Sequence, residues 1–258
     1  MDNRLTSNVS KFAMVPEDQL PDGVDLGISF TSVCINIAIY LPWLVSECLK
    51  LGVVLRRGVA DHIKDAADMH HSAKRADIVI NCTGLGSLNL GGVQDSTLYP
   101  QRGQIALVRN VPSESELTMY SISGTDDGPE EATYIMHRPA AGGCVLGGCR
   151  QNGRWDSQPD LNLAARMMKR CIELDPSIVP QDRGVEALSI VRHGVGLRPM
   201  RDNGPRIELE SVSMDLEANV SVVHLYGHGG CGYQMSYATA QAAVDLVYRA
   251  SAKITSRL

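Results

Sequence analysis

The sequence lacks paired cysteines, a concentrated basic segment and internal repeats. Its seven cysteines are odd in number and form no C-x-x-C pair. This argues against a disulfide framework or a zinc site and favours buried, reduced thiols in an intracellular compartment. Lysines and arginines are scattered and the net charge is −5. A nucleic-acid partner is therefore not expected, because phosphate binding needs a concentrated basic surface.

The sequence also gives no sign of a membrane segment or of a leader. The first residues are polar and mixed in charge, so no signal peptide is expected. A stretch from Leu26 to Ser46 has no charge and is long enough to span a bilayer, but it contains Pro42 and several polar residues. We predict instead a buried strand near 28–34, then a helix near 41–51 with Pro42 in its first turn.

What is present indicates an α/β protein of one or two domains. The chain has 258 residues, of which 44% are hydrophobic and 21% charged, as in ordinary globular proteins. Residues 1–25 are predicted to be a polar loop and 62–73 a loop or short helix. Short apolar strands are predicted at 53–55 and 77–81. The strand–helix–strand order, followed by another buried strand, predicts a parallel sheet.

The middle of the chain has a different pattern. Glycines, prolines and acidic turns separate three predicted strands, which favours an antiparallel sheet with one face against a pocket; the strands are 104–109, 133–137 and 144–148. An amphipathic helix is predicted over 160–175. Its apolar side consists of Leu161, Leu163, Met167, Met168 and Cys171. The end returns to α/β style, with a strand at 220–225 and a helix at 235–252, so we predict two domains interleaved in sequence.

Three local motifs are candidates for chemistry. The segment Tyr226–Gln234 (Y-G-H-G-G-C-G-Y-Q) lies between a predicted strand and a predicted helix. Its glycines would let backbone N–H groups approach phosphate or the carbonyl edge of a flavin, although a tight structural turn is the alternative. The second motif is Cys82-Thr83-Gly84, which follows a predicted buried strand. The third is G-V-G-L-R-P, in which Arg198 can grip a carboxylate with two parallel hydrogen bonds.

Taken in order and spacing, several motifs resemble the D-amino-acid oxidases, over about residues 20–250. They are R-A-D-I-V-I-N-C-T-G, R-G-Q-I-A-L-V-R, T-Y-I-M, V-G-L-R-P-M-R and Y-G-H-G-G-C-G-Y-Q. The resemblance implies an FAD-binding, parallel-sheet domain over 35–96 and 194–258. It further implies an antiparallel-sheet substrate domain over 1–34 and 97–193. A sarcosine- or glycine-oxidase-like enzyme is an alternative whose motifs match less closely.

The resemblance also implies roles for particular residues. Arg198 would pair with the α-carboxylate of a D-amino acid, Tyr134 would hydrogen-bond the same end, and the carbonyl of Gly230 would receive the amine. The positions implied to bind FAD are Val59, Thr83, Gly84, Gly229, Gly230, Gly232, Tyr233 and Gln234. Hydride would pass to the flavin, and oxygen would then be reduced to hydrogen peroxide.

Arg150 predicts a preference among substrates. The run G-G-C-R-Q-N-G-R-W resembles the D-aspartate oxidase branch, in which an arginine here neutralises a side-chain carboxylate. A guanidinium facing the pocket would disfavour apolar side chains, because it would be desolvated without a partner. The alternative is that Arg150 turns outward to solvent.

Two further features concern the ends of the chain. No G-x-G-x-x-G strand–turn–helix occurs before Leu20, so we expect the first βαβ unit of the FAD-binding domain to be missing. A truncated form, a fragment complemented by another chain or a non-catalytic remnant would each explain this. The last residues, Ser256-Arg257-Leu258, resemble a peroxisomal signal and predict recognition by the import receptor.

Overall fold

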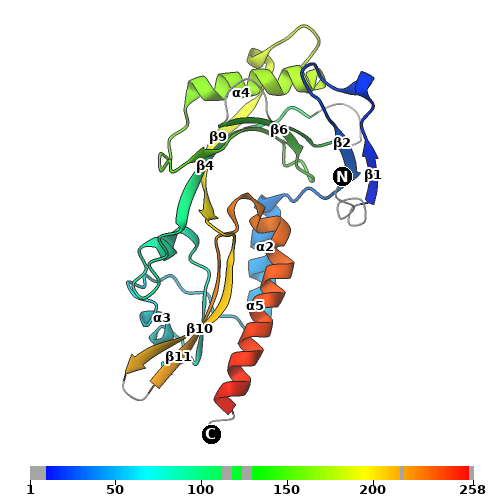
Figure 1. Cartoon of the computed structure of the whole chain (residues 1–258). Helices are drawn as coiled ribbons and strands as arrows, with labels where there is room; N and C mark the ends of the chain where they lie inside the picture. The colour runs from blue at the N-terminus through cyan, green and yellow to red at the C-terminus, as the bar shows by residue number, and fades with distance from the viewer. Residues whose placement is uncertain (1–9, 112–117, 124–129, 216–217, 256–258) are drawn as a thin grey trace. The chain divides into compact units, whose positions relative to one another are not determined.

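The computed structural model describes residues 10–111, 118–123, 130–215 and 218–255, which form two compact units. The first unit comprises the described parts of Met1–Cys48, Gly103–Arg150 and Gln158–Val195. The second comprises those of Leu49–Arg102, Gln151–Ser157 and Gly196–Leu258. Two long strands, β4 (Leu98–Val108) and β9 (Ile190–Arg201), contribute residues to both units (Figure 1).

The main sheet has the strand order β5-β6-β7-β4-β8, and β9 also pairs with β4. The other strands are β5 (Tyr120–Ile122), β6 (Glu131–His137), β7 (Cys144–Cys149) and β8 (Gln151–Asn152). The pairs β5–β6, β6–β7, β7–β4 and β4–β8 are antiparallel. The three strands predicted for the middle of the chain, and their antiparallel character, are thus confirmed.

Helix α4 (Leu161–Leu174) supplies the core of the first unit. Asp160 is its N-cap, and its carboxylate accepts hydrogen bonds from the backbone N–H groups of Asn162 and Leu163. The helix packs on β6 and β7 through buried residues, namely Leu163, Ala164, Met167, Met168 and Cys171. The prediction was wrong for Leu161, which is 68% exposed. Helical periodicity places it near this face, but side chains at the first helical position have fewer neighbours.

The N-terminal part of the first unit differs from the prediction in three ways. Within the predicted polar loop, β1 (Ser10–Met14) forms a strand that pairs antiparallel with β2 (Ile28–Thr31). The predicted burial of β2 was wrong, because all four of its residues are exposed. Helix α2 (Ile37–Lys50) begins four residues earlier than predicted, because Asn36 caps it through its side-chain oxygen.

As a consequence, Pro42 lies at the sixth position of α2 and not in its first turn. It has no N–H to donate to the carbonyl four residues back. None of the residues of α2 is buried, although its sequence is almost entirely apolar. Large side chains such as Trp43 and Leu49 are 50% and 52% exposed.

The second unit contains a three-stranded sheet with the order β10-β11-β3. Strand β3 (Ile78–Asn81) pairs in parallel with β11 (Ala218–Tyr226). Of the three strands from which a parallel sheet was predicted, only 77–81 belongs to this sheet, because β2 pairs antiparallel with β1 and 53–55 forms no strand. Strand β10 (Arg206–Asp215) was not predicted and pairs antiparallel with β11. Helix α5 (Gly232–Thr255) contacts all three strands and begins three residues before the predicted start, and α3 (Asp65–Asp68) is the short helix expected in 62–73.

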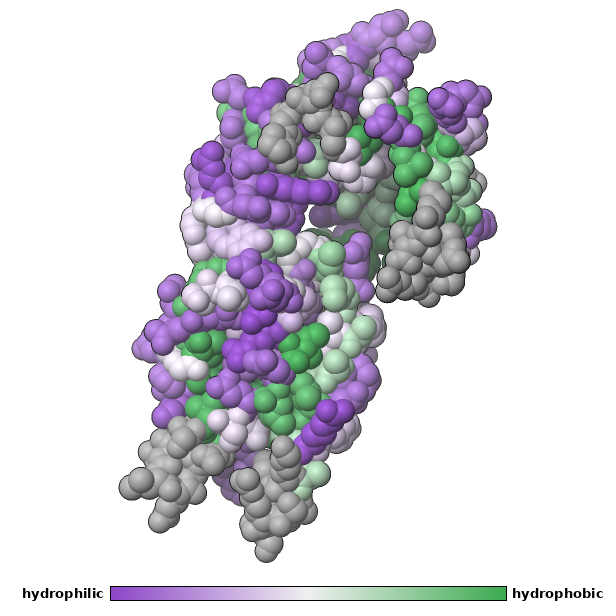
Figure 2. Space-filling model, in the orientation of Figure 1, coloured by the Kyte–Doolittle hydropathy of each residue, from purple (hydrophilic) through white to green (hydrophobic). Residues whose placement is uncertain are grey.

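The predicted strand at 53–55 is absent, and Val53, Val54 and Leu55 form no regular structure. These side chains are at least half exposed. Figure 2 shows further hydrophobic residues among hydrophilic ones on the surface of the unit that carries α3, β10 and α5. A short apolar run therefore predicts a strand only where a neighbouring strand is present to pair with it.

Short 3-10 helices complete the described secondary structure. They are η1 (Glu17–Gln19), η2 (Gly84–Leu88), η3 (Pro176–Ile178), η4 (Val185–Ala187) and η5 (Gly229–Cys231). Among the described helices, none is both long enough and apolar enough to cross a membrane. The assignment of FAD to one predicted domain and substrate to the other remains a prediction.

The two leucines at the start of α4 allow a matched test of this core. Leu163→Ala is expected to lower the free energy of unfolding by about 2–5 kcal/mol, because Leu163 is 2% exposed and fills the core. Leu161→Ala is expected to change it by less than about 0.5 kcal/mol. Urea unfolding of both variants measures the difference, and equal losses would contradict the packing described for α4.

Candidate functional site at the carboxyl ends of β3 and β11

The parallel pairing of β3 with β11 brings two of the sequence motifs together. Asn81, the last residue of β3, lies opposite His224 of β11. The segment after β3 begins with Cys82-Thr83-Gly84, and the segment after β11 is the glycine-rich run that starts at Gly227. In sheets with parallel strands, ligands bind at the carboxyl ends of the strands, where both segments lie.

Three glycines bring the end of β9 to the same place. A Cβ atom on Gly230 would lie 3.5 Å from Cδ of Arg198, so this predicted pair lies side by side. A Cβ on Gly84 would lie 3.9 Å from Cβ of Pro199, and one on Gly229 only 2.6 Å from Sδ of Met200. Arg198–Met200 therefore lie against the turns that follow both parallel strands.

Gly84 and Gly229 also adopt a backbone conformation that is unfavourable for other residues. Gly84 has φ +57° and Gly229 has φ +56°, a left-handed conformation that glycine adopts at little cost. At Gly229 a side chain would in addition collide with Met200. A side chain at Gly84 would therefore strain the backbone, and one at Gly229 would add a collision to that strain.

The glycine segment suits an anionic or electron-rich group. Gly227, Gly229 and Gly232 have the G-x-G-x-x-G spacing between strand β11 and helix α5, a signal that the sequence analysis did not use. Gly230 and Gln234 are exposed, and Tyr233 is 43% exposed. Backbone N–H groups at the start of a 24-residue helix carry positive potential. These residues fit the carbonyl edge of a flavin ring.

Thr83 and Val59 differ in their surroundings. The Thr83 hydroxyl lies 2.8 Å from Oδ1 of Asn81 and 2.7 Å from Oγ of Ser87, so it is engaged within the chain. Val59 is 83% exposed in the irregular segment before α3. The roles of both toward FAD remain predictions.

The remaining predicted residues, Tyr134 and Arg150, belong to the first unit. Tyr134 lies on β6 opposite Gly147, and its ring occupies the space that side chains at Gly147 and Gly148 would fill. A Cβ on Gly147 would lie 2.1 Å from Cζ of Tyr134. Arg150 follows β7 with an exposed side chain, and its N–H donates to the carbonyl of Glu130 at 2.6 Å.

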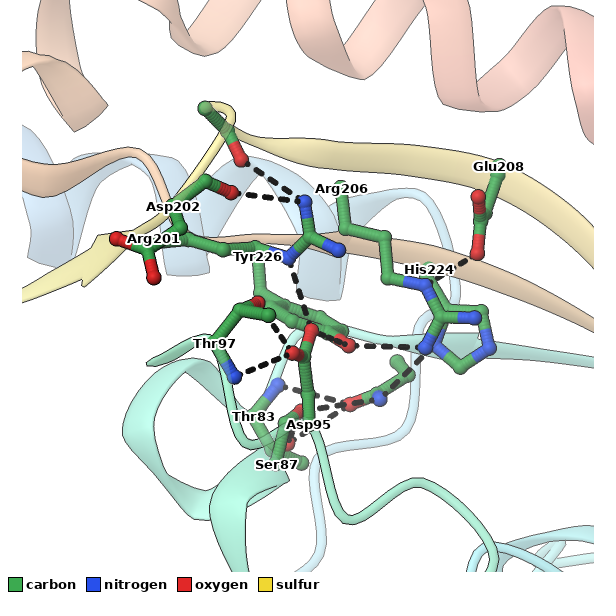
Figure 3. Close-up of polar contacts among 12 residues, drawn as sticks. Thr83, Ser87, Asp95, Thr97, Arg201, Asp202, Arg206, Glu208, His224 and Tyr226 are labelled. Carbon is green, nitrogen blue, oxygen red and sulfur yellow. Dashed lines mark hydrogen bonds and ion pairs between the residues drawn. The ribbon is translucent and has the colours of Figure 1, made fainter. Parts of the chain in front are cut away.

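Next to the glycine segment the second unit contains a buried carboxylate that sequence reasoning missed (Figure 3). Asp95 accepts hydrogen bonds from the side chains of Arg201 at 2.8 Å and Tyr226 at 2.9 Å. It also accepts from the N–H and hydroxyl groups of Thr97. Burial favours the protonated carboxyl, but these hydrogen bonds outweigh it and hold the pKa of Asp95 well below its usual range.

The hydroxyl of Tyr226 links this carboxylate to a second group of charges on β10. It accepts a hydrogen bond from Nη1 of Arg206 at 3.0 Å, and Nη2 of Arg206 donates to Glu210 at 3.0 Å. Burial lowers the pKa of Arg206, but its partners Tyr226 and Glu208 raise it overall. The alternation of charges along β10 is the sequence signal that marks this strand, but nothing in it identifies the partners.

Both the fold and the sequence of this chain are similar to those of known proteins. The arrangement, a mixed α/β fold with several sheets, resembles that of glycine oxidase from Bacillus cereus, with a TM-score of 0.51 over 69% of this chain and 44% of that one. The identity to that structure is 16%, so the likeness concerns the fold alone. The model of the family described as FAD dependent oxidoreductase (DAO) matches residues 9–246.

The chain belongs to this FAD-dependent oxidoreductase family. It is 46% identical over 243 residues to a D-amino-acid oxidase of Fusarium vanettenii, covering 94% of this chain and 64% of that protein. A D-amino-acid oxidase of Schizosaccharomyces pombe is 34% identical, with 92% and 64% covered. A D-aspartate oxidase of Cryptococcus neoformans is 33% identical, with 93% and 68% covered. The chain thus spans about two thirds of the length of these relatives.

The contact between Tyr134 and Gly147 can be tested by a double-mutant cycle. Gly147→Ala is expected to destabilise the protein by about 1–3 kcal/mol, because the new methyl group displaces the Tyr134 ring. In a Tyr134→Ala background the same change is expected to cost much less, since the ring is gone. Gly196→Ala, where a Cβ has no neighbour within 4 Å, is the control. Equal costs in both backgrounds would refute the contact.

The Asp95 network predicts a pH dependence. Because its folded-state pKa is depressed, the carboxylate stabilises the fold above its unfolded pKa of about 3.9 and loses that contribution as the pH falls below it. Asp95→Asn is expected to cost about 2 kcal/mol at pH 7 and clearly less at about pH 2, because the contribution is lost between the unfolded and the folded pKa. Denaturant unfolding at both pH values measures this. The exposed Asp202, changed to Asn, is the control, and a cost independent of pH would contradict the assignment.

Proposed function

We propose that this chain forms the larger part of an FAD-dependent oxidase that converts D-amino acids into 2-oxo acids, ammonia and hydrogen peroxide. The observation that carries the proposal is the proximity of Arg198 to Gly230 at the carboxyl ends of β3 and β11. The names of the relatives, D-amino-acid oxidase and D-aspartate oxidase, support it.

This proximity suits the shape of the substrate. In an α-amino acid the carboxylate and the amine are attached to one carbon, so their partners must lie next to each other. The guanidinium of Arg198 is always charged and can bind the carboxylate through two hydrogen bonds. The carbonyl of Gly230 is proposed to accept from the substrate amine. For Tyr134, which belongs to the first unit, the role of hydrogen-bonding the carboxylate rests on the family resemblance alone. Together these groups fix which bond of the α-carbon faces the cofactor.

The cofactor positions proposed are those from the sequence. Gly229, Gly230, Gly232, Tyr233 and Gln234 would lie along the flavin ring, and Val59, Thr83 and Gly84 near the rest of FAD. FAD, when bound, would accept the hydride of the α-carbon and pass two electrons to oxygen, which leaves as hydrogen peroxide. The resulting imino acid takes up water and releases ammonia.

Arg150 is proposed to select acidic substrates by pairing with a side-chain carboxylate. Its exposed side chain in this structure is compatible with that role and equally with its alternative, an outward orientation. The D-aspartate oxidase among the relatives supports the acidic preference. The D-amino-acid oxidase of higher identity supports a neutral one.

A second candidate is a non-catalytic protein that does not hold FAD by itself. It is favoured by the exposed apolar residues of α2. Peroxisomal import through Ser256-Arg257-Leu258 also remains a proposal, because these three residues lie outside the described part of the chain.

A flavin absorbance spectrum after addition of FAD separates the two candidates. The proposal predicts bound flavin that bleaches anaerobically with a D-amino acid, and Arg198→Leu is expected to retain flavin but to slow bleaching at least about 100-fold. If Arg150 selects acidic substrates, Arg150→Gln slows bleaching by D-aspartate and not by D-alanine. The exposed Arg154, changed to Gln, controls for loss of charge. No bound flavin would support the non-catalytic candidate.

A further inference from the structure

The side chain of Asn81 uses its full hydrogen-bonding capacity. It is 1% exposed at the end of β3. Its oxygen accepts from the N–H of Thr83 at 3.1 Å and from the Thr83 hydroxyl at 2.8 Å. Its NH₂ group lies 3.2 Å from Oγ of Ser87 and 3.2 Å from Nδ1 of His224. Two donors and two acceptor sites are all that an amide side chain has, so no other orientation satisfies these partners.

This orientation fixes the tautomer of His224. Because an N–H of Asn81 points at Nδ1, that nitrogen must accept, and the ring proton must be on Nε2. Nε2 lies 3.0 Å from the carboxylate of Glu210, which accepts it. The imidazole is therefore neutral in this arrangement.

The surroundings of His224 favour the same neutral state. The ring is 1% exposed. Arg206, Glu208 and Glu210 of β10 are the charged groups that act on it, and the Tyr226 ring of β11 packs edge-on with centroids 5.8 Å apart. Burial and then the charge of Arg206 lower the pKa of His224, against the opposing effect of Glu210.

We propose that Asn81, aligned by neutral His224, is a positioning residue that holds the Thr83–Gly84 turn in the conformation that receives FAD. The proposal rests on the proposed function only for the identity of what the turn receives. Protonation of His224 would place an N–H at Nδ1, opposite the N–H of Asn81. The amide would then have to turn over, and its oxygen would no longer accept from Thr83. FAD affinity should consequently fall as the pH drops through the pKa of His224.

Two substitutions at His224 separate its two hydrogen bonds. In His224→Asn the side-chain oxygen takes the place of Nδ1 and still accepts from Asn81, while nothing can be protonated. In His224→Gln the amide reaches Glu210 in place of Nε2, but Asn81 has no acceptor. A general packing defect would affect both variants, whereas the positioning role distinguishes them.

The first measurement is amide hydrogen exchange of residues 82–86 without FAD at pH 7.5. His224→Gln is expected to exchange about tenfold faster there than the wild type, and His224→Asn within about twofold of it. The second measurement is the FAD dissociation constant by flavin fluorescence at pH 7.5 and at a lower pH at which NMR shows His224 to be protonated. His224→Gln is expected to bind about tenfold more weakly at pH 7.5, and His224→Asn to lose the pH dependence of the wild type.

Asn36→Ala is the control, because Asn36 is also buried and hydrogen-bonded but lies in the first unit. It should lower the melting temperature without faster exchange at 82–86.

Equal exchange of His224→Gln and wild type would overturn the inference, whatever the FAD result. If the wild type binds no FAD, the proposed function fails, while the exchange comparison still decides the positioning role. If His224→Gln does not fold, the wild type decides, since protection at 82–86, after correction for intrinsic rates, must decrease at the lower pH at which NMR shows His224 to be protonated.

Discussion

The parallel pairing of β3 with β11 determines where the candidate site of the second unit lies. Four residue pairs, from Ile78 opposite Ser221 to Asn81 opposite His224, fix the register. A shift by one residue would turn Asn81 and His224 away from each other, because neighbouring side chains along a strand point to opposite faces. The turn at Thr83 and the glycine segment begin at one edge of the sheet only in the observed register.

Burial of polar groups is the cost of this arrangement, and the network offsets it by complete hydrogen bonding. Asn81, Ser87 and His224 are nearly inaccessible to solvent, and each has partners within 3.2 Å. A buried polar group without a partner costs about 1–3 kcal/mol, so loss of one member destabilises the others. The network therefore specifies one conformation for the ends of β3 and β11 and for the turn that begins at Thr83.

The sequence predicted those helices and strands whose hydrophobic pattern is strongly periodic. It also identified, through short motifs, the residues that are candidates for the site. The face of α4 and the strands β3, β6, β7 and β11 follow from local patterns, apart from Leu161 at a helix end. Proximity of Arg198 to Gly230 could be anticipated only through the family resemblance. The predicted roles of the site residues remain predictions.

What the sequence could not provide depends on partners distant in the chain. Asp95 contacts Arg201 and Tyr226, which are 106 and 131 residues away, and no local pattern joins them. Strand β10 was not predicted although charges alternate along it, and nothing local indicates that Arg206 and Glu210 pair with groups of β11. The exposure of β2 and α2 was missed for the opposite reason, since a charge-free run indicates burial without saying against what.

Hydrogen exchange with and without FAD tests the central claim, that the carboxyl ends of β3 and β11 form the cofactor face. The account predicts that FAD slows exchange at residues 82–86 and 227–234. It predicts no change at residues 70–75, which precede the amino end of β3. Protection confined to residues 70–75, or no protection at either turn with FAD bound, would contradict it.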